Sequence, residues 1–163
     1  MMTNKVIYIM GVSGSGKTTI GQMLSSKTGY PFYDADNFHP EANINKMASG
    51  QPLNDEDRWP WLDNIHSFVV HQLQTNSVIF ACSALKESYR KKLSEDIAPQ
   101  CRWILLNGSY QIIMDRLEHR KDHYMPPSLL QSQFDALEIS GNIIEINISL
   151  SPVKIVEDIL KKI

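Results

Sequence analysis

The chain has 163 residues, the size of one globular domain, and 42% of them are hydrophobic. Its 16 basic and 18 acidic residues leave a formal charge of -2, so bulk charge favours neither nucleic acid nor a membrane surface as a partner. No apolar run reaches the length of a membrane span, and the N-terminus lacks the features of a signal peptide, so a cytoplasmic protein is expected.

The hydrophobic pattern predicts strands and helices that alternate along the chain. Short β-rich runs predict strands over residues 5–10, 31–34, 77–82, 102–106 and 143–148. Apolar residues at helical spacing predict helices over residues 17–27, 40–47, 55–73, 86–97, 110–119, 126–137 and 152–160. This alternation indicates an α/β fold, a five-stranded parallel sheet flanked by helices. Because no repeat or linker interrupts the pattern, residues 1–163 are expected to form one domain.

The cysteines and histidines do not predict a metal site. Cys82 and Cys101 both lie in strand-like apolar runs, so two buried free thiols are expected rather than a disulfide or a metal pair. His39, His119 and His123 lack the spacing of zinc ligands.

Residues 11–18, with the sequence GVSGSGKT, match the phosphate-loop pattern G-x-x-x-x-G-K-[ST]. Glycines let the backbone approach a phosphate closely, and the following helix N-terminus presents its N–H groups to the anion. Lys17 would reach the β- and γ-phosphates, and the Thr18 hydroxyl would bind Mg²⁺. A glycine turn with a solvated lysine is the alternative, but the strand before and the helix after favour ATP binding. The expected ATP contacts are Gly11, Val12, Ser13, Gly14, Ser15, Gly16, Lys17, Thr18 and Thr19.

Two carboxylates, Asp34 and Asp36, follow the second predicted strand. Ligands of open α/β sheets usually bind at the carboxyl ends of strands, so both side chains are candidates for the site. One would face the Mg²⁺ shell, and the other would orient a substrate hydroxyl and accept its proton. A polar turn that caps the next helix is the alternative.

Several cations are candidates for binding an acidic substrate or the γ-phosphate. Arg58 could grip a carboxylate, or pair with Asp55 on the surface, and Lys86 and Arg90 share a helix face or are simply solvated. Arg116 and Arg120 precede a short polar segment that is typical of a mobile lid, about residues 119–127. Arginines there would stabilise the charge of the transferring phosphoryl group; an exposed basic face is the alternative.

The sequence closely resembles the gluconate kinases over nearly its whole length. The matching stretches are residues 10–18, 34–40, 43–50, 52–58, 60–62, 82–86, 89–90, 123–125, 129–134 and 137–138, with Arg116 and Arg120. The phosphate loop alone indicates only a superfamily. The segments DRWPWL at 57–62 and CSALK at 82–86 are far more specific.

The resemblance implies ATP-dependent phosphorylation of the 6-hydroxyl of D-gluconate, with Mg²⁺ as cofactor. It also implies a P-loop kinase fold of the nucleoside-monophosphate-kinase and shikimate-kinase type, with a short lid, and commonly a homodimer. By position, the catalytic residues would be Lys17, Asp36, Arg116 and Arg120. Gluconate would be bound by Asp36, His39, Arg58, Lys86 and Arg90, and Mg²⁺ by Thr18 and, through water, Asp34. Asn37 and Tyr124 depart from the family pattern without removing a catalytic group.

Three other functions were compared with this one. A kinase for another small acceptor, such as shikimate or a nucleotide, would need the same phosphate loop. A nucleotide-binding regulatory module without catalysis would retain ATP binding alone, but intact Lys17, Thr18 and Asp36 argue against it. A GTPase fits less well, because the segment NKMA at residues 45–48 lacks the aspartate of a guanine-reading NKxD element.

Overall fold

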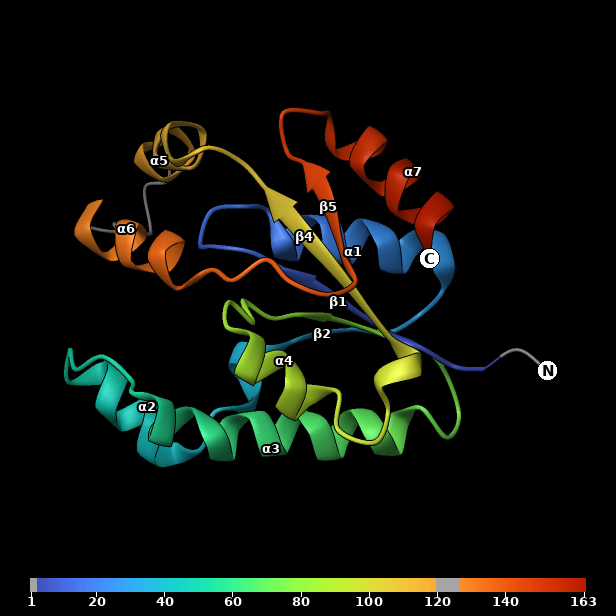
Figure 1. The fold of residues 1–163 in the computed structure, drawn as a ribbon, viewed down its shortest axis with the longest axis horizontal. Helices are drawn as coiled ribbons and strands as arrows, with labels where there is room; N and C mark the ends of the chain where they lie inside the picture. Colours follow the sequence, from blue (N-terminus) through green and yellow to red (C-terminus); the bar gives the residue numbers. More distant parts are fainter. Residues whose placement is uncertain (1–2, 120–126) are drawn as a thin grey trace.

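Five parallel strands form the centre of the computed structural model, which describes residues 3–119 and 127–163 (Figure 1). The strands are β1 (Val6–Met10), β2 (Phe32–Asp34), β3 (Val78–Ala81), β4 (Cys101–Asn107) and β5 (Ile143–Asn147). Their order across the sheet is β2-β3-β1-β4-β5, and every neighbouring pair is parallel. The predicted sheet is therefore confirmed.

Helices connect the strands. They are α1 (Lys17–Thr28), α2 (Glu41–Ala48), α3 (Asp55–Gln72), α4 (Glu87–Leu93), α5 (Tyr110–Glu118), α6 (Pro127–Ala136) and α7 (Pro152–Lys162), with short 3-10 helices η1 (Ala35–Phe38) and η2 (Ala98–Gln100). The sequence prediction was wrong about the length of α4, which it extended to Ile97. The helix ends at Leu93, and Asp96 adopts a positive φ of 64° that a continuing helix does not allow.

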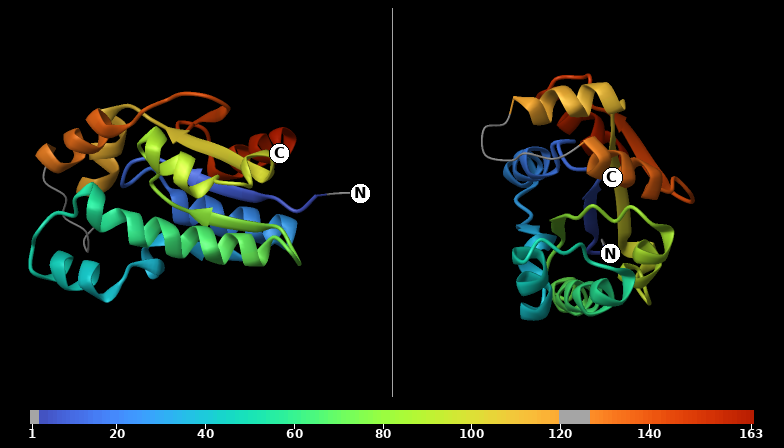
Figure 2. Two further views of the ribbon diagram at one scale, coloured as in Figure 1. Left: turned by 60° about the horizontal axis from the view of Figure 1, so that its bottom comes forward. Right: turned by 90° about the vertical axis from the view of Figure 1, so that its left-hand side faces the viewer.

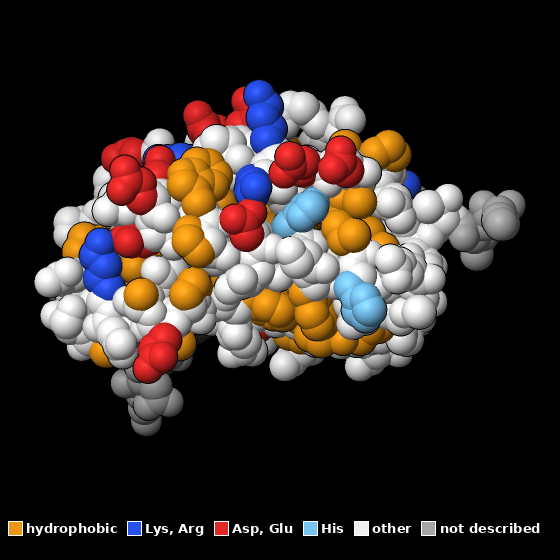
Figure 3. Space-filling model, turned by 90° about the horizontal axis from the view of Figure 1, so that it is seen from below, with side chains coloured by type: hydrophobic (Ala, Val, Ile, Leu, Met, Phe, Trp, Pro, Cys, Tyr) orange, Lys and Arg blue, Asp and Glu red, His pale blue; other side chains and the backbone are white. Residues whose placement is uncertain are grey.

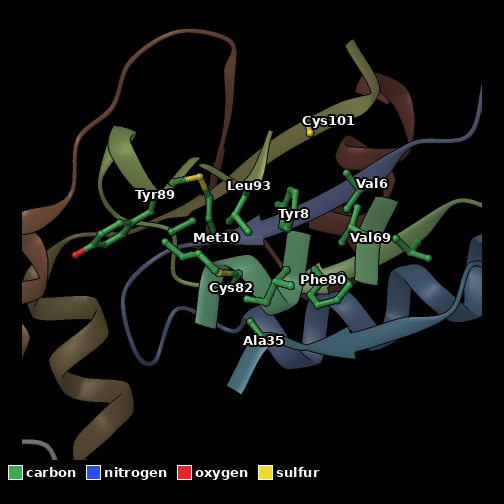
Figure 4. Packing of buried hydrophobic residues seen from close by; sticks show 14 of the residues in the cluster. Val6, Tyr8, Met10, Ala35, Val69, Phe80, Cys82, Tyr89, Leu93 and Cys101 are labelled. Atoms are coloured by element: carbon green, nitrogen blue, oxygen red, sulfur yellow. The ribbon is translucent and has the colours of Figure 1, made fainter. Parts of the chain in front are cut away.

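The two faces of the sheet each bury a separate hydrophobic cluster. On β1, Val6, Tyr8 and Met10 pack against α3 and α4, whereas Ile7 and Ile9 point to the side of α1 and α7. Figure 1 shows α3 and α4 below the sheet and α7 above it, and Figure 4 shows the packing of the first cluster. Because β1 is buried on both faces, it forms a continuous apolar run rather than an alternating one.

The outer face of α2 and α3 is mixed, and α2 exposes Ile44 and Met47 on it. Seen from below, acidic and basic side chains of both signs are spread among hydrophobic ones (Figure 3). Among the described residues, no helix is both long and apolar enough to pass through a membrane.

The two cysteines are buried free thiols, as predicted. Figure 4 shows Cys82 and Cys101 apart from each other in the first cluster. Burial raises the pKa of each thiol to about 12, so both are protonated at neutral pH.

The carboxyl ends of the strands converge on one edge of the sheet. The loops after β1, β2 and β3 all begin there, and α2 and α6 lie at the same end of the molecule (Figures 1 and 2). Sequence segments far apart are thus brought together where ligands of this fold class bind.

Candidate active site

A cavity of about 780 Å³ opens at this edge of the sheet. Its walls come from the phosphate loop, the loop after β2, the start of α3, the loop after β3, and α6. Of the residues that the sequence predicts for the site, those lining it are Ser13, Gly14, Gly16, Lys17, Thr18, Thr19, Asp34, Asp36, Arg58 and Lys86. The volume is within the range of small-molecule sites.

The phosphate loop has a backbone that requires glycine. Gly11, Gly14 and Gly16 all have positive φ, at 148°, 80° and 99°. A Cβ at Gly11 would lie 2.8 Å from Ser15 Oγ and 3.1 Å from the Leu106 carbonyl oxygen, so no side chain fits there. Because Gly16 caps α1, no capping side chain covers the first N–H groups of this helix. Those groups are available to an anion.

Polar atoms of the loop fit a phosphate chain. Lys17 begins α1, and its Nζ donates to the Gly11 and Val12 carbonyl oxygens, both at 3.0 Å. Within the described part of the chain, the buried Ser15 Oγ has no hydrogen-bond partner. A glycine-lined loop with a lysine ammonium and an unsatisfied hydroxyl is a suitable site for the phosphates of ATP.

The acidic pair lies beside this loop. Asp34 ends β2 and caps η1, because its Oδ1 accepts a hydrogen bond of 2.9 Å from the Asp36 N–H. The capping turn considered as an alternative is thus present, but both residues also line the cavity. Burial raises the pKa of Asp36 above its usual 3.8, and the adjacent Asp34 raises it further, while His39 and Lys17 lower it.

The oxygen atoms available next to the loop suit Mg²⁺. Thr18 on the first turn of α1 and Asp34 at the end of β2 both line the cavity. Mg²⁺ prefers hard oxygen ligands and keeps several waters, so one hydroxyl and one carboxylate are a compatible set.

Two basic side chains, Arg58 and Lys86, line the same cavity, and we call them the cation cluster. Arg58 and Lys86 both approach the Asp55 carboxylate, at 3.5 and 3.3 Å, and both lie 5.6 Å from the centroid of the Tyr89 ring. The Tyr89 hydroxyl donates to Asp55 Oδ1 at 2.5 Å, and this bond, with Lys86 and Arg58, lowers the pKa of Asp55. The predicted alternative of an Arg58–Asp55 pair is present, yet it does not remove Arg58 from the cavity wall.

Asp55 and Tyr89 were not among the residues predicted for the site. Tyr89 lines the cavity. Asp55 does not line it, but its carboxylate contacts three side chains that do, those of Arg58, Lys86 and Tyr89. The available signal was spacing: Tyr89 follows Lys86 by one helical turn, as Arg58 follows Asp55.

Two predicted gluconate ligands are not among the residues that line the cavity. The His39 ring stacks on Trp61, with centroids 4.4 Å apart, and it is Trp61 that faces the cavity. Arg90 is 5% exposed, and its guanidinium is bonded to backbone carbonyl groups. In this structure Arg90 therefore binds backbone carbonyl groups, whereas the sequence predicts that it binds gluconate.

Helices α5 and α6, which flank the predicted lid in the sequence, also contact the phosphate loop. Arg116 on α5 donates to the Ser15 carbonyl oxygen at 3.4 Å and to the Ile148 carbonyl oxygen at 2.9 Å. Gln133 on α6, which was not predicted for the site, accepts a hydrogen bond from the Ser13 N–H at 2.7 Å. Arg120 and most of the predicted lid lie outside the described residues.

Known proteins are similar to this chain in sequence and in fold. Residues 13–143 match the shikimate kinase family. A gluconokinase of Arabidopsis thaliana is 43% identical, covering 99% of this chain and 94% of that protein. The thermosensitive gluconokinase of Escherichia coli is 42% identical, over 84% of this chain and 73% of its own. A crystal structure of a gluconokinase from Sinorhizobium meliloti superposes with a TM-score of 0.87 at 38% identity, covering 99% and 92% of the two chains.

These matches extend over most of the chain, and the Arabidopsis relative is aligned over 99% of it, a stretch that spans the positions of the site described above. The predicted resemblance and the P-loop kinase fold are confirmed. The chain belongs to the gluconokinases, P-loop kinases with the shikimate kinase fold.

Proposed function

We propose that this protein transfers the γ-phosphoryl group of ATP to the 6-hydroxyl of D-gluconate, giving 6-phospho-D-gluconate and ADP. The observation that carries the proposal is one cavity lined by a phosphate loop, by the acidic pair, and by Arg58 and Lys86. An anion with several hydroxyls requires a cation for its carboxylate and a carboxylate beside its reacting hydroxyl, and this cavity offers both. The gluconokinase relatives support this acceptor over other hydroxy acids.

The phosphate loop would bind the triphosphate through its backbone N–H groups and Lys17. Mg²⁺, when bound, would supply charge that neutralises the β- and γ-phosphate oxygens. Thr18 would hold it directly and Asp34 through water, since both line the cavity next to the loop. Arg116, which already contacts the loop at Ser15, would add positive charge near the transferring group, and Arg120 stays a predicted lid arginine.

Asp36 would orient the 6-hydroxyl and accept its proton as the new P–O bond forms. Phosphoryl transfer passes through a loose transition state, so the proton leaves late and a carboxylate is a sufficient base. Burial and Asp34 raise the pKa of Asp36, which makes it a better proton acceptor than an exposed aspartate. Arg58 and Lys86 would bind the carboxylate at the other end of gluconate.

Replacing Arg58 is expected to weaken gluconate binding selectively. A hydrogen bond to a charged group contributes about 1.5–3 kcal/mol, so Arg58→Gln should raise the KM for gluconate about 10- to 100-fold. The KM for ATP should stay near normal, because the phosphate loop is unchanged. Initial rates over a matrix of ATP and gluconate concentrations measure both constants.

Lys91→Gln is the matched control for this experiment. Lys91 is an exposed cation on α4 whose Nζ lies 3.9 Å from Glu87, and it does not line the cavity. This variant should leave both KM values unchanged. A rise in the KM for ATP alone in Arg58→Gln would place Arg58 on the nucleotide side and contradict the assignment.

The resemblance implies the quaternary structure, and the compartment was predicted from the sequence. A homodimer and a cytoplasmic location both stay predictions. Light scattering coupled to size-exclusion chromatography measures the first directly.

A further inference from the structure

Arg90 joins two segments that are about 50 residues apart in the chain. We call residues 83–86 the substrate loop and residues 137–140 the exit segment, because the latter follows α6. Nη1 of Arg90 donates to the Ala84 and Leu85 carbonyl oxygens at 2.7 and 3.1 Å. Nη2 donates to the Glu138 carbonyl oxygen at 2.5 Å and lies 3.4 Å from Ser140 Oγ. One buried guanidinium thus binds both segments.

Glu138 makes further bonds, one to the substrate loop and one to the first residue of α4, directly after that loop. Its N–H donates to the Leu85 carbonyl oxygen at 2.8 Å, and its Oε1 accepts from the Glu87 N–H at 2.8 Å. The Leu85 carbonyl oxygen therefore receives bonds from both Arg90 and Glu138. The two segments are held together at several points rather than by one contact.

These bonds act on a turn with an unfavourable backbone. Ala84 has a φ of 42°, in the left-handed region, where a residue with a Cβ is disfavoured by roughly 1–2 kcal/mol. Such a conformation persists when surrounding contacts determine it. Arg90 binds the carbonyl groups of Ala84 itself and of the next residue, Leu85. Directly after this turn, Leu85 and Lys86 line the cavity.

We propose that Arg90 is a positioning residue, which fixes the substrate loop so that Lys86 reaches the carboxylate of gluconate. This inference rests on the proposed function, and it replaces the direct contact with gluconate that the sequence suggested for Arg90. The exit segment takes part because α6 is itself attached to the phosphate loop through Gln133 and Ser13. The substrate loop is thereby bound to a helix that the nucleotide site also holds in place.

A double-mutant cycle with Arg90→Lys and Lys86→Gln tests this role. Lysine keeps the charge but cannot bridge several carbonyl groups, so Arg90→Lys should raise the KM for gluconate about tenfold and leave the KM for ATP unchanged. If Arg90 acts through Lys86, the double variant should have the same KM as Lys86→Gln alone. Additive effects would overturn the proposal, because they would mean that Arg90 contacts gluconate itself or acts elsewhere.

Two further variants separate positioning from folding. Arg102 also donates to backbone carbonyl groups, at Pro99 and Cys101, but away from the cavity, so Arg102→Lys should change neither KM. Glu138 is exposed, and Glu138→Ala removes its side-chain bond to the Glu87 N–H and its negative charge near Arg90 while the backbone bonds stay, so a smaller rise of about threefold in the KM for gluconate is expected. Unchanged KM values in both Arg90→Lys and Glu138→Ala would overturn the proposal.

The unmodified protein distinguishes this proposal from the one on which it rests. Without gluconate-dependent ADP release in the unmodified chain, the proposed function fails, and the role of Arg90 fails with it. If that activity is present, the double-mutant cycle tests only the role of Arg90, and its failure leaves the proposed function standing.

Discussion

Lys17→Ala is expected to lower kcat for ATP and gluconate by about 10²–10³-fold. Lys17 begins α1, and its ammonium lies against the Gly11 and Val12 carbonyl oxygens, inside the glycine-lined loop. The charge of the transferring phosphoryl group grows on oxygens that this ammonium would neutralise. ADP release at saturating concentrations of both substrates measures the loss.

Lys27→Ala controls for the removal of a lysine from the same helix. Lys27 is an exposed residue in the last turn of α1, far from the loop, and its replacement should leave kcat unchanged. The Lys17→Ala loss should appear with every acceptor that the protein uses, because it concerns the phosphates. A Lys17→Ala protein with normal kcat would show that the loop does not take part in the reaction.

Asp36→Asn is expected to lower kcat by about 10²–10⁴-fold, with a smaller effect on either KM. Asparagine keeps the size of the side chain and lines the cavity in the same way, but it cannot accept the proton of the 6-hydroxyl. The acid limb of the kcat profile should lie above the ordinary aspartate range, because the pKa of Asp36 is raised and only its ionised form is a base. That limb should be absent from the residual activity of Asp36→Asn.

The same substitution should not lower stability. The folded-state pKa of Asp36 is raised, so the folded protein binds its proton more tightly than the unfolded chain and its ionised form is unfavourable at neutral pH. Asp36→Asn should therefore raise the free energy of unfolding at pH 7, and this gain should disappear below about pH 4, the unfolded pKa. Chemical denaturation at the two pH values measures it.

Asp63→Asn is the control for Asp36→Asn. Asp63 lies on the exposed side of α3, where it pairs with Lys92 at 2.8 Å, and an exposed pair contributes little to stability. Normal kcat is expected there. A high kcat in Asp36→Asn would remove this residue from the role of base.

The sequence was sufficient to predict the fold because its signals are local. Each strand is a short apolar run between turn residues, and the glycines of residues 11–16 are needed for a backbone that few other residues allow. The end of α4 was misjudged, since apolar spacing continues to Ile97 while the backbone leaves the helix after Leu93. There the buried side chain of Ile97 contributes to the core from a turn rather than a helix.

The site was only partly predictable because its remaining contacts are tertiary. Asp55 and Tyr89 are in contact although they are 34 residues apart in the sequence, and Gln133 and Ser13 although they are 120 residues apart. No local sequence pattern predicts such pairs. For Arg90, a local pattern does exist, but it predicts the wrong contact. Its helical spacing from Lys86 suggests that both side chains face the cavity. The substrate loop instead places its own carbonyl groups next to the Arg90 guanidinium, which binds them.

The most direct test of the central claim is ADP release from Mg-ATP, measured with D-gluconate, shikimate, other sugar acids and nucleoside monophosphates as separate acceptors. The structure and the family together predict turnover that is strong with D-gluconate and weak with the rest. Turnover selective for another acceptor would keep the phosphate chemistry and contradict the assignment of Arg58 and Lys86 to gluconate. ATP binding without turnover on any acceptor would contradict the kinase activity itself.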